Sequence, residues 1–65
     1  MLILGDEVYG FDCVSLNMTP EMWEVLGKVG VVVAIVNKHV KLKFFDDDDY
    51  TWWYPREEAE KHAVI

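Results

Sequence analysis

A predicted β-hairpin in the middle of the chain is the feature that most restricts its fold. The segment Val29–Val36 is rich in β-branched residues and too short for a lone helix, so it predicts a strand, and we expect both of its faces to be covered. Asn37 and Lys38 then supply a tight turn. In His39–Phe44 apolar residues alternate with lysines, which predicts a strand with one face toward the core. We therefore expect the chain to fold around a β-sheet.

The segments that flank the hairpin predict further short elements. They are a strand at Glu7–Phe11, a long loop at Asp12–Thr19, a helical turn from Thr19-Pro20-Glu21 to Gly27, a turn at Asp46–Asp49, a strand at Tyr50–Tyr54, a helical or 3-10 turn at Pro55–Ala59 and a closing strand at Ala63–Ile65. Thr19 can cap a helix, Pro20 fits its first position, and Pro55 cannot donate within a ladder. Residues 1–65 are thus expected to form a single all-β domain. Its predicted architecture is a small SH3-like barrel of about five strands with a long first loop and one short helical turn.

The stability of so short a chain has to come from its apolar core. Cys13 is the single cysteine among 65 residues, which excludes an intramolecular disulfide, and it is expected to be a half-buried small hydrophobe. His39 and His62 are expected to be exposed, and with Cys13 they match no zinc spacing. The carboxylates at Asp46–Asp49 lack the spacing, glycine and distal glutamate of a calcium loop, which favours a solvated turn. We expect no metal and no cofactor.

The charge of the chain narrows the class of partner. The formal net charge is −6, and only six Lys and Arg residues are present, so a nucleic acid is an unfavourable ligand. A protein or peptide partner of basic or mixed charge fits better. No apolar run reaches the length of a transmembrane helix, and Met1–Leu4 is too short for a signal peptide, so no membrane contact is expected. The lone thiol then favours a reducing, cytoplasmic setting.

Aromatic residues are the candidates for partner binding. Trp52, Trp53 and Tyr54 alternate along one predicted strand, so either Trp53 faces inward and its neighbours outward, or the reverse. In both cases at least one large ring is exposed, and exposed Trp and Tyr are frequent binding anchors. Tyr9 and Phe11 share a parity on the first strand and are expected to extend the same surface. For the exposed ring of Trp52, Trp53 or Tyr54, the alternative is packing against the long loop. Trp23 and its helical turn are expected to cap the open end of the barrel.

Three stretches of the chain together resemble a known repeat. They are Gly5-Asp6-Glu7-Val8, then Met22-Trp23-Glu24-Val25-Leu26-Gly27-Lys28-Val29-Gly30-Val31-Val32, and finally Trp52-Trp53-Tyr54-Pro55. This pattern is similar to the SH3-like repeat of the Mind bomb E3 ubiquitin ligases, which also recurs in the plant ligase Keep on Going. Leu26-Gly27-Lys28-Val29-Gly30 is the most specific part. The resemblance implies a module for substrate recognition, which binds a peptide while a RING domain elsewhere recruits the ubiquitin-charged enzyme.

The residues leave two other binding roles open and give no sign of catalysis. One is a generic adaptor barrel for proline-rich or methylated-lysine peptides, since aromatic rings near carboxylates can bind a cation. The other is a structural module whose aromatic face packs on a neighbouring domain or a second copy. The sequence contains no Ser-His-Asp or Cys-His pattern, so we expect a protein that is not an enzyme.

Overall fold

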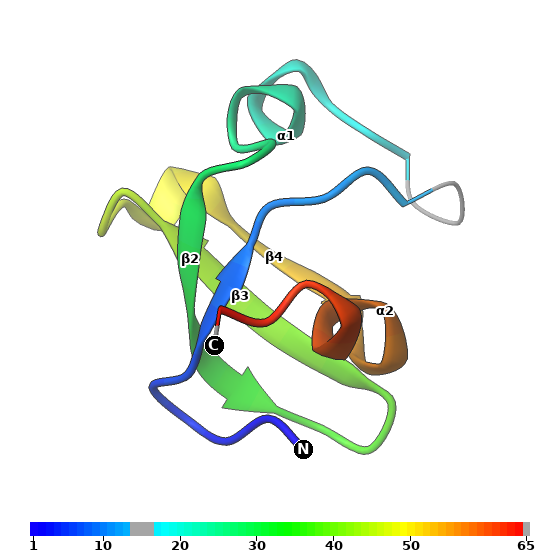
Figure 1. Cartoon of the computed structure of the whole chain (residues 1–65). Coiled ribbons are helices and arrows are strands. Elements are labelled where there is room, and N and C mark those ends of the chain that lie inside the picture. Colours follow the sequence, from blue (N-terminus) through cyan, green and yellow to red (C-terminus); the bar gives the residue numbers. More distant parts are fainter. Residues whose placement is uncertain (14–16, 65) are drawn as a thin grey trace.

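The fold is a small antiparallel sheet accompanied by short helices. The computed structural model describes residues 1–13 and 17–64, and its four strands lie in the order β1-β2-β3-β4 (Figure 1). The elements are β1 (Glu7–Tyr9), α1 (Pro20–Glu24), β2 (Val29–Ile35), β3 (His39–Phe44), the 3-10 helix η1 (Asp48–Tyr50), β4 (Thr51–Pro55) and α2 (Arg56–Lys61). In Figure 1, α1 lies at the top, beyond the start of β2, and α2 follows the end of β4 on the right. The β-dominated fold expected from the sequence is confirmed.

The predicted hairpin forms the centre of this sheet. β2 and β3 pair antiparallel, with Val31 opposite Lys43 and Val32 opposite Leu42. The register then shifts, so that Ala34 rather than Val33 faces Lys41. This irregularity is a β-bulge, which increases the local twist of a strand pair.

The inner face of the sheet and the two helices enclose one apolar core. Its buried members are Leu2, Val8, Phe11, Cys13, Met22, Val25, Val32, Val40, Leu42, Phe44, Tyr54 and Ala59. The strand residues among them follow the period of two expected for one buried face. On β2 the inner position opposite Phe44 is Gly30, and a β-carbon added there would lie 2.6 Å from the Phe44 ring. The ring therefore occupies space that any larger residue would need.

The predicted closed barrel of five strands is not formed by residues 1–13 and 17–64. The helical turn expected at Pro55–Ala59 extends through Lys61 as α2, which leaves too few residues for a fifth strand. Ala63 makes only an isolated bridge to Val8. The amide of Tyr9 still donates to the carbonyl of His62 (3.0 Å), and the amide of Val64 donates to the carbonyl of Glu7 (2.9 Å). The C-terminal segment thus covers the outer edge of β1 without closing the sheet, and Ile65 lies outside the described residues.

The expectations about the burial of β2, Trp23 and His62 are wrong. β2 is covered on one face only, because Val29, Val31 and Val33 are exposed on the other. Trp23 is about half exposed, since the short helix α1 turns its neighbour Met22 into the core instead. His62 is half-buried, because its ring stacks on Phe11 at 4.6 Å and 8°. In the loop expected at Asp12–Thr19, residues 14–16 lie outside the described residues.

Candidate interaction surfaces

A groove between α1 and the β3–β4 connection combines aromatic rings with carboxylates. It is lined by Thr19, Glu21, Asp49, Tyr50 and Trp52, and we call these five residues the acidic aromatic groove. Thr19 caps α1 by accepting a hydrogen bond from the Met22 amide (3.3 Å), which places Glu21 in the first turn of the helix. The two walls of the groove come from segments about thirty residues apart in the chain.

The β3–β4 connection turns sharply to bring its aromatic residues to this groove. Phe45 and Asp46 both have positive φ angles, 58° and 51°, which reverse the chain after β3. The Asp47 side chain then accepts a hydrogen bond from the Asp49 amide (2.9 Å) and so caps η1. As a result Tyr50 points toward α1, where its hydroxyl donates to Glu24 Oε2 at 2.6 Å. This hydrogen bond joins the two walls.

The rings at the groove form a continuous row anchored in the core. Tyr50 contacts Phe45 (centroids 5.2 Å apart) and Trp52 (5.9 Å), in both cases edge to face. Trp52 in turn contacts the buried ring of Phe44 at 6.4 Å. Tyr50 and Trp52 are each half-buried, so one side of each ring is fixed and the other is open to solvent. Such rings lose little side-chain entropy when a partner binds.

The groove is strongly acidic. The hydrogen bond to Glu24 is the largest cause of a raised pKa of Tyr50, followed by desolvation and by the charges of Glu24, Asp47 and Glu21. Two nearby carboxylates are compensated, because Lys43 Nζ lies 3.0 Å from Asp48 and 3.8 Å from Asp46.

The ion pair between Lys43 and Asp48 shifts the pKa of both groups. The interaction with Asp48 raises the pKa of Lys43 and lowers the pKa of Asp48. No ion pair within residues 1–13 and 17–64 neutralises Glu21, Glu24 or Asp49 in the same way. The open side of the aromatic row therefore faces uncompensated negative charge.

The five residues predicted to bind a partner fall into three groups. Trp52 lines the acidic aromatic groove, whereas Tyr9 and Trp53 are exposed on the opposite, outer face of the sheet. Trp53 lies across from Lys41, whose Nζ is 5.7 Å from the centre of the indole ring. The predicted alternation in β4 thus places Trp53 outward and Trp52 and Tyr54 on the inner side.

Phe11 and Tyr54 are buried and do not reach a surface. Tyr54 is 0% exposed because it pairs with Val40 on the inner face. Phe11 is 4% exposed, and its ring lies 5.1 Å from that of Tyr54. The parity argument failed for Phe11 because β1 ends at Tyr9 and Gly10 bridges to Leu26, so the alternation of β1 does not continue to residue 11.

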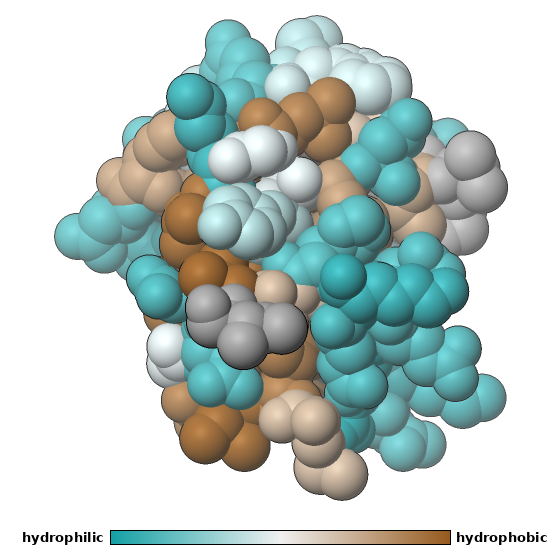
Figure 2. Space-filling view, viewed as in Figure 1, coloured by the Kyte–Doolittle hydropathy of each residue, from teal (hydrophilic) through white to brown (hydrophobic). Residues whose placement is uncertain are grey.

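A second exposed surface, the valine face, lies on the outer side of the sheet. We define it as Val29, Val31 and Val33 of β2 with the flanking rings of Tyr9 and Phe45; Figure 2 shows an apolar band over β2. The sequence analysis missed this surface by assuming that β2 is buried on both sides. The outward lysines of β3 held the missing signal, since residues paired directly with them must face outward too.

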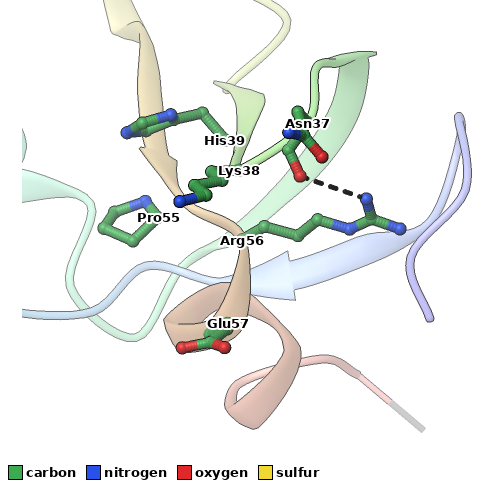
Figure 3. Close-up of a pocket in the computed structure, with 6 residues that line it drawn as sticks. All are labelled: Asn37, Lys38, His39, Pro55, Arg56 and Glu57. Atoms are coloured by element: carbon green, nitrogen blue, oxygen red, sulfur yellow. Dashed lines mark hydrogen bonds between the residues drawn. The ribbon is translucent and has the colours of Figure 1, made fainter.

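A third depression lies between the β2–β3 turn and α2. Asn37, Lys38, His39, Pro55, Arg56 and Glu57 line it (Figure 3). Arg56 is already engaged, because its Nη1 donates to the Asn37 carbonyl (3.4 Å) and its Nε lies 3.6 Å from Glu60. The side chains of His39 and Glu57 point away from each other in Figure 3.

The described part of the chain also contains no evident metal or membrane element. Within residues 1–13 and 17–64, no three His, Cys, Asp or Glu side chains are grouped so that they could hold a metal ion. None of the helices seen there has the length and apolar character needed to cross a membrane. Comparison with protein-family models, with curated proteins and with solved structures found no match to this chain.

Proposed function

We propose that this chain is a non-catalytic protein-interaction module that binds a basic peptide segment in the acidic aromatic groove. The observation that carries the proposal is the pairing of half-buried rings, Tyr50 and Trp52, with the carboxylates of Glu21, Glu24 and Asp49. A lysine or arginine side chain can place its aliphatic part on the rings and its charge near the carboxylates. The net charge of −6 would also speed the encounter with a basic partner.

The arrangement of the strands supports an SH3-like relationship. After β1 the chain forms α1, then β2, β3 and β4 follow as a meander, and the C-terminal segment returns to β1. Together with the resemblance of Leu26–Gly30 to the Mind bomb repeat, this favours a substrate-recognition module of a ubiquitin ligase. A cytoplasmic setting belongs to the same proposal. The ligase assignment predicts that a ligase subunit coprecipitates with the chain, and recovery of the chain with a target but without any ligase counts against it.

Peptide selection followed by calorimetry tests the binding activity. A displayed library of short random peptides is selected against the wild-type chain, and we expect the recovered sequences to be enriched in Lys and Arg. Trp52→Ala should weaken binding of a selected peptide by about fivefold or more, because truncated aromatic anchors typically cost over 1 kcal/mol. Binding should also weaken as salt is raised, since the carboxylates are exposed and screened.

The neighbouring tryptophan gives a matched control. Trp53→Ala removes an equally large ring from the other side of the same strand and should leave peptide affinity unchanged. Because Trp52 also packs on Phe44, the double variant Glu21→Gln/Asp49→Asn is measured as well. It removes two exposed charges and no core contact, and should weaken binding at low salt. Selection of neutral or acidic peptides, or loss of binding in Trp53→Ala alone, contradicts the proposal.

The same titration separates the proposed ligand from two related chemistries. The selected peptide is compared with a form that carries trimethylated lysine and with a proline-rich peptide lacking basic residues. Tighter binding of the trimethylated form would identify the edge-to-face rings of Tyr50 and Trp52 as a methyl-lysine site. Preference for the proline-rich peptide would instead favour a generic adaptor of the SH3 type.

A further inference from the structure

We infer that the valine face is the interface of a symmetric dimer of this chain, with the two-fold axis running along β2. Val29, Val31 and Val33 are 42%, 39% and 43% exposed, and Phe45 is 55% exposed beside them. In an antiparallel sheet with one solvated face, that face is usually polar, as it is on β3. A contiguous apolar surface on a small domain marks an interaction site. This face points away from the core side of β4, where Trp52 lies, so the inference does not depend on the proposed function.

The pairing of charges across the sheet identifies a second copy as the occupant. Glu7 on β1, Val31 on β2 and Lys43 on β3 lie side by side in one row, because Glu7 pairs with Val31 and Val31 pairs with Lys43. The row therefore carries a negative charge on one side of β2 and a positive charge on the other. A two-fold axis along β2 brings β1 of each copy over β3 of the other. Each Glu7 then faces Lys43 of the second copy, and the two Val31 side chains meet on the axis.

The neighbouring row of side chains on the valine face is also complementary when the same two-fold rotation is applied. Tyr9 pairs with Val29, and Phe45 lines the same groove as Val29 on the opposite side of β2. The axis places Tyr9 of one copy over Phe45 of the other, and Val29 over Val29. Apolar groups thus meet apolar groups in this row, and opposite charges meet in the other. Lys43 remains able to contact Glu7 while paired with Asp48 and Asp46, because its ammonium has three donors.

The size of the face predicts a weak dimer. β2 has seven residues, so it is about 23 Å long, and β1 and β3 lie about 10 Å apart. This footprint is smaller than the roughly 800 Å² per partner of a standard interface. The charge of −6 on each copy also opposes association at low salt. We therefore expect a monomer–dimer equilibrium that is resolved between about 10 µM and 1 mM protein at near-physiological ionic strength.

Sedimentation equilibrium of the full chain tests the interface. The wild type should show concentration-dependent dimerisation. Val31→Lys should abolish it, because it places two ammonium groups together on the axis. Val36→Lys serves as the matched control: it changes a valine beyond the end of β2 that is at least as exposed as Val31, and it should leave dimerisation unchanged. Circular dichroism confirms that both variants remain folded.

A charge-exchange experiment tests the position of the axis. Glu7→Lys alone places like charges opposite Lys43 of the second copy, and Lys43→Glu alone places like charges opposite Glu7, so each variant should be monomeric. An equimolar mixture of the two restores both pairs of opposite charges, and the mixed dimer should form at least about tenfold more tightly than either variant with itself. A wild type that remains monomeric up to about 1 mM overturns the inference. So does a mixture that associates no better than its components.

Discussion

The hydroxyl of Tyr54 is buried in the core and lowers the free energy of unfolding. Tyr54 is fully buried, and its hydroxyl has no hydrogen-bond partner among the described residues. A buried polar group without a partner loses its hydration without compensation. Tyr54→Phe keeps the ring contacts with Phe11 and Phe44 and should raise the free energy of unfolding by about 1 kcal/mol in urea denaturation. A loss of stability of the same size would mean that the hydroxyl makes a favourable contact.

The same hydroxyl predicts a loss of stability in alkali. Burial raises the pKa of Tyr54 to about 12, whereas the unfolded chain titrates near the ordinary value of 10. The folded state therefore keeps this hydroxyl protonated up to a higher pH than the unfolded state does. The free energy of unfolding is unaffected by ionisation of this group below pH 10 and falls as the pH rises toward 12. At about pH 11 the wild type should have lost roughly 1 kcal/mol relative to Tyr54→Phe. Denaturation of both proteins across this range measures the difference, and parallel pH profiles would refute it.

Gly30 is required by the ring that packs on it. A β-carbon at this position would approach three atoms of the Phe44 ring within 2.6–2.9 Å, and both residues lie in the centre of the sheet. Gly30→Ala should therefore destabilise the fold by about 1–3 kcal/mol, the usual cost of overpacking a core. Adding Phe44→Leu should make the Gly30→Ala substitution less costly than it is in the wild type, because the shorter side chain leaves room. Equal costs in the two backgrounds, measured by a double-mutant cycle, would exclude this contact as the cause.

At the scale of elements, α1 depends on its cap because it has only five residues. Thr19 Oγ1 accepts a hydrogen bond from the Met22 amide, and Pro20 occupies the first helical position. Thr19→Ala should lower the free energy of unfolding by about 1 kcal/mol, whereas Thr19→Ser keeps the acceptor and should cost less. Because α1 holds Glu21 and Glu24 at the groove, the alanine variant should also bind a basic peptide more weakly. Equal effects of alanine and serine would show that the cap is unimportant.

The elements also show where sequence patterns are sufficient and where they fail. Regular alternation of apolar and charged residues correctly predicted the bounds of β3, and the Thr19-Pro20-Glu21 signal correctly predicted the start of α1. Both features depend only on residues that are neighbours in the chain. The β-branched run of β2 predicted a strand but not its exposed face, since that depends on which strands lie beside it and what covers them. Likewise the acidic aromatic groove joins segments about thirty residues apart, so only Trp52 was identified beforehand. Local order was predictable, and the surfaces created by packing were not.

At the scale of the whole molecule, the C-terminal segment takes the place of the predicted fifth strand. It covers the outer edge of β1 through the two hydrogen bonds that make up the bridge between Val8 and Ala63, and His62 stacks on Phe11 beside it. An uncovered edge strand can pair with other chains, so this short segment protects the β1 edge of the sheet from such pairing.

Val64→Pro tests this role because it removes the amide that donates to the Glu7 carbonyl. We expect the free energy of unfolding to fall by about 1–3 kcal/mol, since Glu7 loses its partner and the segment is released. Val64→Ala is the control, because it also removes the valine side chain but keeps the amide that donates to Glu7. With the edge of β1 open, the proline variant should form large aggregates in dynamic light scattering, in contrast to the dimer limit of the wild type. Equal free energies of unfolding for the two variants, with no aggregates of either one, would mean that the C-terminal segment does not protect β1. The pairing of the four strands would then hold the sheet without it.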